Sequence, residues 1–148
     1  MNEIKTNDNL HIEGFFDEQT STISYVVHDN IEKKCAVIDS VLDFDYSSGD
    51  IDYVNADKII SYIDRNKLNL EWLIETHVHA DHLSASPYIQ KKLGGKIGIS
   101  EKISDIQNIF GKTFNAGTEF QRDGSQFDKL FKDNDEYKIG NINCKVIN

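Results

Sequence analysis

Three of the chain's five histidines fall within six residues, and an aspartate lies among them. The segment, residues 77–82, reads HVHADH. His77 and His79 are two residues apart, so in extended backbone their side chains point to the same side and can bind one metal ion. Asp81 and His82 follow where the chain turns, and they can bind a second metal or hydrogen-bond the first ligands. Imidazole and carboxylate ligands favour zinc, iron or manganese over calcium or magnesium. We therefore predict a metal site made by His77, His79, Asp81 and His82, with Asp81 also as a catalytic residue.

The elements around this segment support a metal site over the alternative, a solvated loop that contains histidines without a role. The apolar run 70–75 (LEWLIE) predicts a strand that leads directly into the histidines. A helix is expected from about Ser86, which suits the cap, with Pro87 in its first turn and Gly94-Gly95 at its end. Open α/β folds bind ligands at the carboxyl ends of strands, and this loop would lie at such an end.

The other elements predict an α/β fold with a mixed sheet and helices on one face, in one domain over residues 1–148. The first three strands are expected to pair as an antiparallel meander. A helix is expected over about 56–67, with Asn55 as its cap. The segment 40–54 is expected to be a polar, turn-rich linker and 101–134 a less regular stretch. The expected strands are 10–16, 22–28, 34–39, 70–75, 96–99 and two short ones around Gly140-Asn141.

The charge, the N-terminal sequence and the cysteines indicate which binding partners and which cellular compartment to expect. The formal net charge is −9, which repels phosphate backbones and anionic lipids, so we expect no nucleic-acid and no membrane partner. The chain begins MNEIK, which lacks the basic and then apolar profile of a secretion signal. The two cysteines, Cys35 and Cys144, are expected to be buried, reduced thiols. These features predict a cytoplasmic protein.

Residues 76–82 (THVHADH) resemble the signature of the metallo-β-lactamase superfamily, an αβ/βα sandwich whose metals lie between two sheet edges. Further segments resemble the branch of persulfide dioxygenases and β-lactamase-like hydrolases, relatives of glyoxalase II. These segments are 13–17 (EGFFD), 22–27 (TISYVV), 37–39 (VID), 83–88 (LSASPY) and 124–128 (GSQFD).

The resemblance implies a metal-dependent hydrolase or persulfide dioxygenase that acts on a small thiol such as a glutathione derivative. His77 and His79 would bind the first metal, and Asp81 and His82 a second zinc where one is present. In the dioxygenase branch a single iron is held by two histidines and one aspartate, which leaves positions open for oxygen and a thiol. Asp81 and His82 would then support that site by hydrogen bonding. Asp39, at the end of a strand, would either orient the metal loop or serve as a turn or cap residue.

The sequence departs from the family at its end. The family takes a third metal histidine from a loop that follows a strand like residues 143–147, and a bridging aspartate further on, whereas this sequence ends at Asn148. His11 and His28 are poor substitutes because each lies in an early strand with no motif around it. We therefore expect only the N-terminal part of the sandwich, with weakly bound zinc or iron and no turnover by this chain alone. The alternative is a non-catalytic, truncated module that folds by self-association, and a homo-oligomer is expected in either case.

Overall fold

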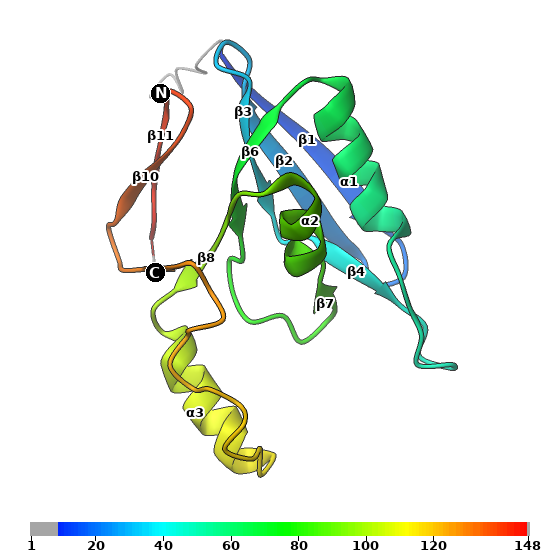
Figure 1. Ribbon diagram of the computed structural model, residues 1–148, viewed down its shortest axis with the longest axis vertical. Coiled ribbons are helices and arrows are strands. Elements are labelled where there is room, and N and C mark those ends of the chain that lie inside the picture. The colour runs from blue at the N-terminus through cyan, green and yellow to red at the C-terminus, as the bar shows by residue number, and fades with distance from the viewer. Residues whose placement is uncertain (1–8, 148) are drawn as a thin grey trace, which may run out of the picture.

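The computed structural model describes residues 9–147, so the first residues, on which the absence of a secretion signal was argued, lie outside the described part. Its main element is a six-stranded mixed sheet (Figure 1). The first three strands form the expected antiparallel meander, and the next three are added in parallel. In spatial order the strands are β1 (Leu10–Asp17), β2 (Thr22–Asp29), β3 (Lys34–Ile38), β6 (Asn69–Ile74), β8 (Lys96–Ser100) and β9 (Lys129–Phe131).

Two helices, α1 (Val54–Arg65) and α2 (Ser86–Leu93), cover one face of this sheet (Figure 1). Ile59 and Ile63 of α1 and Ile89 of α2 are almost fully buried in the cluster that contains Leu73 of β6. The mixed sheet with helices on one face is therefore confirmed. Among the residues that the structure describes, no helix has both the length and the apolar character needed to cross a bilayer.

A hairpin of β10 (Glu136–Ile139) and β11 (Ile142–Lys145) lies on the other side of the sheet from these helices (Figure 1). Tyr137 packs its ring against Trp72 and Phe131, and the Trp72 indole donates a hydrogen bond to the Lys138 carbonyl at 3.0 Å. The hairpin that was expected around Gly140-Asn141 is confirmed, and Gly140 adopts the left-handed φ of +56° that its turn requires.

The prediction of a polar linker between β3 and α1 was wrong in part. The segment contains β4 (Val41–Phe44) and β5 (Ile51–Asp52), which pair with each other. β4 also pairs with β7 (Leu83–Ser84), the short strand that follows the histidine segment. The polar residues of the linker occupy the turn, while Val41 is buried. This small sheet therefore holds the far end of the metal loop.

The expectation of a less regular stretch over 101–134 was also wrong in part, because it contains β9 and the helix α3 (Ile103–Thr113), while residues 114–128 between them form no helix or strand. The buried face of α3 combines Ile103 with Gln107 and Gly111, whereas the apolar Ile109 and Phe110 are exposed. The apolar pattern of the sequence therefore does not mark the face that packs. Gln107 is buried because it accepts the amide of Gly124 and donates to Gln126.

The two expected helix caps lie one or two residues too late. The cap residues are Tyr53 for α1 and Ala85 for α2, and neither makes a side-chain cap hydrogen bond. Asn55 donates instead to Asp43 and Asp17, and Ser86 donates to Glu75. Each of these side chains thus donates to a carboxylate in a charge-assisted hydrogen bond, instead of accepting a backbone N–H at the start of its helix.

Candidate metal centre

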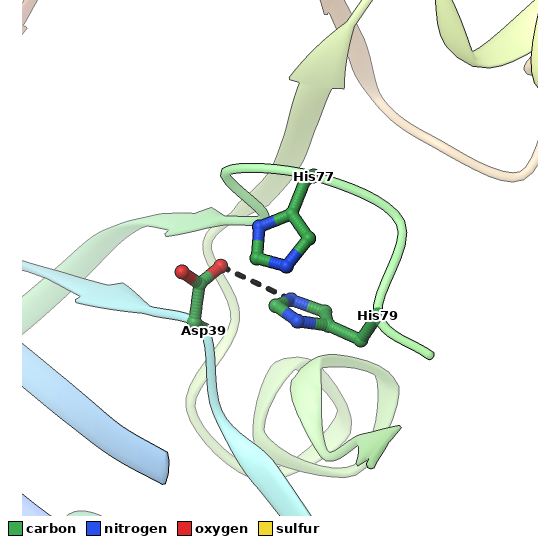
Figure 2. Close-up of side chains that lie close together, drawn as sticks. All are labelled: Asp39, His77 and His79. Carbon is green, nitrogen blue, oxygen red and sulfur yellow. Dashed lines mark hydrogen bonds and ion pairs between the residues drawn. The ribbon is translucent and has the colours of Figure 1, made fainter. Parts of the chain in front are cut away.

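The parallel pairing of β3 and β6 brings the two sequence segments of the site together. Both strands end at the same edge of the sheet, and the Asp39 amide donates to the Ile74 carbonyl at 3.0 Å. Asp39 has a φ of +50°, in the left-handed region that aspartate tolerates better than most residues. This backbone conformation turns the Asp39 side chain toward the histidine segment (Figure 2).

Asp39 holds the start of the metal loop. Its Oδ1 accepts the Thr76 amide at 2.7 Å, and its Oδ2 accepts the Thr76 hydroxyl at 2.6 Å. Although burial raises the pKa of Asp39, hydrogen bonds from His79 and Thr76 hold it below its usual value. Of the two roles considered for Asp39, these contacts favour orientation of the metal loop.

Thr76 in turn sets the orientation of His77. Its hydroxyl proton is given to Asp39, so at the 2.8 Å contact with His77 Nδ1 the hydroxyl oxygen must accept. His77 therefore carries its proton on Nδ1, and Nε2 keeps a free lone pair. The side chain of His77 is exposed, and its ring lies 4.4 Å from that of His79.

His79 is the central ligand candidate, because it belongs to both groups of residues that could hold a metal. Its Nε2 lies 2.8 Å from Glu75 Oε2 and 3.1 Å from Asp39 Oδ1, and both carboxylate oxygens can only accept. Burial lowers the pKa of His79, but the hydrogen bonds to Asp39 and Glu75 outweigh it and raise the pKa to about 9. His79 Nδ1 is buried and has no hydrogen-bond partner within residues 9–147.

His82 presents a second buried nitrogen of this kind. Its Nδ1 donates to the Leu83 carbonyl at 2.8 Å, which leaves the lone pair on Nε2. His82 Nε2 is buried without a hydrogen-bond partner in the described part of the chain. The His82 ring stacks on that of His79, with centroids 4.2 Å apart and planes at 29°.

Asp81 lies on the open side of the same loop. Its Oδ2 accepts the Thr22 hydroxyl at 3.0 Å, and its Oδ1 is 3.8 Å from His79 Nδ1. Its own backbone amide and the Thr22 hydroxyl hold the pKa of Asp81 below its usual value, so the group is a carboxylate at neutral pH.

Three of the four residues predicted from the sequence form one group that could hold a metal ion, and the fourth, His77, lies in a second group that shares His79. One ligand atom each from His79, Asp81 and His82 lie within 4.8 Å of one another, and so do atoms of Asp39, His77 and His79. Two buried imidazole nitrogens without partners are costly unless something binds them. The chemistry of these donors suits zinc or iron. His28 lies elsewhere, against His11 and Tyr62, as the absence of a motif around it implied.

Hollows lie on two sides of the histidine loop, and His79 and His82 line both. One, of about 250 Å³, is bounded by Asp81 and by residues of β4 and the β1–β2 turn. The other, of about 310 Å³, has mainly apolar walls that include Val78, Ile99 and Phe127. A bound metal would thus lie beside two hollows, of which only the first is also bounded by the Asp81 carboxylate.

Comparison with known proteins agrees with this site. The family model of the metallo-β-lactamase superfamily matches residues 18–138. The chain belongs to the metallo-β-lactamase superfamily. The matched region includes β2, β3, β6 and the whole histidine loop.

Several members of this superfamily are similar over most of the chain. A probable metallo-hydrolase of Burkholderia pseudomallei is 46% identical over 138 residues, which are 93% of this chain and 47% of that protein. Glyoxylase B2 of Dictyostelium discoideum is 40% identical over 92% of this chain and 47% of its own length. The crystal structure of ETHE1 from Myxococcus xanthus superimposes with a TM-score of 0.62 at 20% identity, over 90% of this chain and 45% of that one. The chain thus spans about half the length of these relatives, and it shares part of their fold.

Sequence reasoning missed the residues that hold the ligands. Glu75 was expected only as the end of a strand, yet it contacts His79, Ser84 and Ser86. Thr22 lies 59 positions from Asp81 and meets it only through the fold. A charged residue at the end of an otherwise apolar strand is a signal that could have singled out Glu75.

Proposed function

We propose that this chain provides the metal site of a superfamily enzyme that, in its complete form, is a hydrolase or a persulfide dioxygenase acting on a glutathione-type thiol. One observation carries the proposal. In each of the three histidines one ring nitrogen is engaged in a hydrogen bond: His77 with Thr76, His79 with the carboxylates, and His82 with the Leu83 carbonyl. The nitrogens left as ligand atoms are Nε2 of His77, Nδ1 of His79 and Nε2 of His82.

Residues of the chain would divide the chemistry between them. His77 and His79 hold the ion, and His82 and Asp81 complete or support its coordination. A bound zinc or iron supplies Lewis acidity, or open positions for a thiol and oxygen. Asp81, a carboxylate on the open side of the loop, accepts protons or hydrogen bonds from a group that reaches this side.

The substrate class rests on the names of the relatives and on the shape of the site. A glyoxylase and ETHE1 are among the similar proteins, which supports thioester or persulfide chemistry. The apolar hollow beside His77 and His82 suits the carbon part of a thiol-bound group. Iron would favour the dioxygenase and zinc the hydrolase, so the metal found in the protein purified from its native source discriminates the two.

Metal binding by purified variants tests the proposal. Zinc titration in competition with a chromophoric chelator should show one site that is lost in His77→Ala and in His79→Ala. His11→Ala is the matched control, because His11 is an exposed histidine outside the loop, and it should bind as the wild type does. Equal zinc binding by all four proteins would refute the proposed site.

We further propose that the 148-residue polypeptide alone binds metal weakly and has no turnover. All its proposed ligands come from one six-residue segment, whereas catalytic metal sites draw ligands from several elements that fix the geometry. The iron-loaded chain should form no sulfite from glutathione persulfide and oxygen, and the zinc-loaded chain should not hydrolyse a glutathione thioester. Turnover that disappears in His77→Ala, or metal that survives dialysis against a chelator, would contradict this.

The second candidate function is a non-catalytic module that self-associates. Apolar side chains are exposed on the sheet face opposite α1 and α2, on the first two strands of the meander. They include Ile12 (55% exposed) and Phe16 (59%) of β1, beside Ile23 and Tyr25 of β2. Such a face is seldom bare in a soluble protein, so we propose that a second copy covers it about a two-fold axis. Light scattering at tens of micromolar should show a dimer that Phe16→Lys dissociates, and a monomeric wild type would exclude it.

We also propose a cytoplasmic location. Both cysteines are free thiols, which suits a reducing compartment, but only Cys35 is buried as expected and Cys144 is half-buried. Fractionation of the native cells should find the protein in the cytosol, and recovery from the medium or an envelope fraction would contradict this.

A further inference from the structure

Glu75 is a buried carboxylate at the point where β6 becomes the metal loop. The residue is only 5% exposed, and no lysine or arginine pairs with it in the described part of the chain. Its amide donates to the Gly98 carbonyl at 2.9 Å, which ties its backbone to β8. Burial of a carboxylate is costly unless hydrogen bonds replace its water shell, so the donors around Glu75 define its role.

Three side-chain donors converge on this carboxylate from the metal loop and the elements that follow it. Ser84 Oγ and Ser86 Oγ both donate to Glu75 Oε1, each at 2.5 Å, and His79 Nε2 lies 2.8 Å from Oε2. Ser40 is 3.2 Å from Ser86 Oγ, and since Ser86 gives its proton to Glu75, Ser40 is the donor in that pair. Both oxygens of Glu75 therefore serve as acceptors, and the serines fix the rotamer that faces His79.

This arrangement determines which nitrogen of His79 can bind a metal. The proton of Nε2 faces Glu75, while Nδ1 points toward Asp81 and is buried without a partner within residues 9–147. Asp39 also approaches Nε2, but at 3.1 Å, and its Oδ1 already accepts the Thr76 amide at 2.7 Å. Glu75 is thus the carboxylate closer to His79 Nε2. Of the two carboxylates, only Glu75 offers His79 an oxygen atom that is not shared with the Thr76 amide.

We propose that Glu75 is a positioning residue of the metal site, which holds the Nε2 proton of His79 so that Nδ1 is the ligand atom. The inference rests on the proposed metal site. Carboxylates that accept the second N–H of a ligating histidine fix its ring and tautomer, and their loss typically costs about 10- to 100-fold in metal affinity. A carboxylate that only stabilised the fold would change the melting temperature without changing the ligand atom.

The change Glu75→Gln tests this with little change in volume. If the amide oxygen keeps its two serine donors, the amide N–H₂ group faces His79 Nε2, so two donors oppose each other whenever Nδ1 binds metal. Zinc affinity should fall about 10- to 100-fold while the far-ultraviolet circular dichroism stays unchanged. Glu71→Gln is the matched control: the same substitution on the same strand, at a residue that contacts Lys34 and Gly140 instead of the loop. Its zinc affinity should stay within about twofold.

A measurement on the unaltered chain gives an independent answer, including the case in which Glu75→Gln does not fold. In wild-type protein loaded with ¹¹³Cd and labelled with ¹⁵N at histidine, the metal should couple to Nδ1 of His79, and Nε2 should carry a proton. Coupling to His79 Nε2 would overturn the inference, and so would a folded Glu75→Gln variant that binds zinc as tightly as the wild type. If the wild type bound neither zinc nor cadmium, the proposed site itself would be refuted and this inference with it. If the wild type binds metal and Glu75→Gln binds it equally tightly, the inference alone is refuted and the proposed metal site stands.

Discussion

Replacement of Asp39 by asparagine should weaken metal binding at His77, a residue to which Asp39 is linked through the Thr76 hydroxyl. Asp39 Oδ1 accepts the Thr76 amide and His79 Nε2, and an asparagine oxygen at the same place can keep both contacts. Oδ2 accepts the Thr76 hydroxyl at 2.6 Å, and there asparagine presents an N–H₂ group instead. The hydroxyl must then accept from residue 39, and its own proton becomes free to point at His77 Nδ1, 2.8 Å away.

This reversal places the proton of His77 on Nε2, the nitrogen proposed to bind the metal. To bind through Nε2, His77 must either give up the new hydrogen bond or set two donors against each other. A hydrogen bond between neutral groups is worth about 0.5–1.5 kcal/mol and a donor without an acceptor costs about 1–3 kcal/mol, which together span roughly 2- to 150-fold in affinity. We therefore expect zinc to bind Asp39→Asn about 10- to 100-fold more weakly, in agreement with the usual effect of such supporting carboxylates.

The assay is zinc titration against a chromophoric chelator, combined with long-range ¹H–¹⁵N spectra that report which nitrogen of His77 carries the proton. Asp29→Asn is the matched control, because Asp29 is a buried carboxylate that accepts the Ile31, Glu32 and Asn141 amides far from the loop. It should lower the free energy of unfolding and leave zinc affinity within about twofold. Unchanged zinc affinity in Asp39→Asn, or a His77 proton that stays on Nδ1, would refute the relay through Thr76.

Three further predictions concern the stability of the fold. Leu73→Ala removes a fully buried side chain from the core beneath the site, so urea unfolding should show a loss of about 2–5 kcal/mol; a loss below about 1 kcal/mol would contradict that packing. Gly98→Ala would place a Cβ atom 2.5 Å from Phe131 Cε2, so the ring must move. We expect the free energy of unfolding to fall by about 1–3 kcal/mol in the same urea experiment. Equal stability would show that this contact is loose. Burial, and then the neighbouring His11, lower the pKa of His28 below 6.5, so the unfolded chain binds more protons than the folded one as the pH falls below about 6.5. The free energy of unfolding should therefore decrease over that range, and it should decrease less in His28→Gln; identical pH profiles for the two proteins would contradict this.

The sequence was sufficient to predict the elements whose buried face is apolar and periodic. The strands of the meander, β6, β8 and both core helices follow from such patterns, because burial of those residues is what stabilises them. α3 could not be found in this way, since its buried face contains Gln107 and Gly111 while Ile109 and Phe110 are exposed. β4 and β5 are short, and they exist because β4 pairs with β7 across 41 positions of sequence, from Leu42 to Leu83, which no local pattern records.

The candidate site shows the same division. His77, His79, Asp81 and His82 are contiguous, so their spacing alone indicated a metal site. The residues that determine the ligand atoms come from elsewhere: Asp39 lies 40 positions before His79, and Ser86 lies 11 positions after Glu75. Their contacts depend on the parallel pairing of β3 with β6 and on the start of α2, so the sequence could not predict them before the topology was known.

The most direct test of the metal centre is the X-ray absorption spectrum of the chain loaded with one equivalent of zinc. We expect a first shell of nitrogen and oxygen at roughly 2.0–2.1 Å, with the multiple scattering of at least two imidazoles, one of which is lost in His77→Ala. A sulfur shell at roughly 2.3 Å, which would place the zinc on Cys35 or Cys144, or a shell without imidazole, would contradict it.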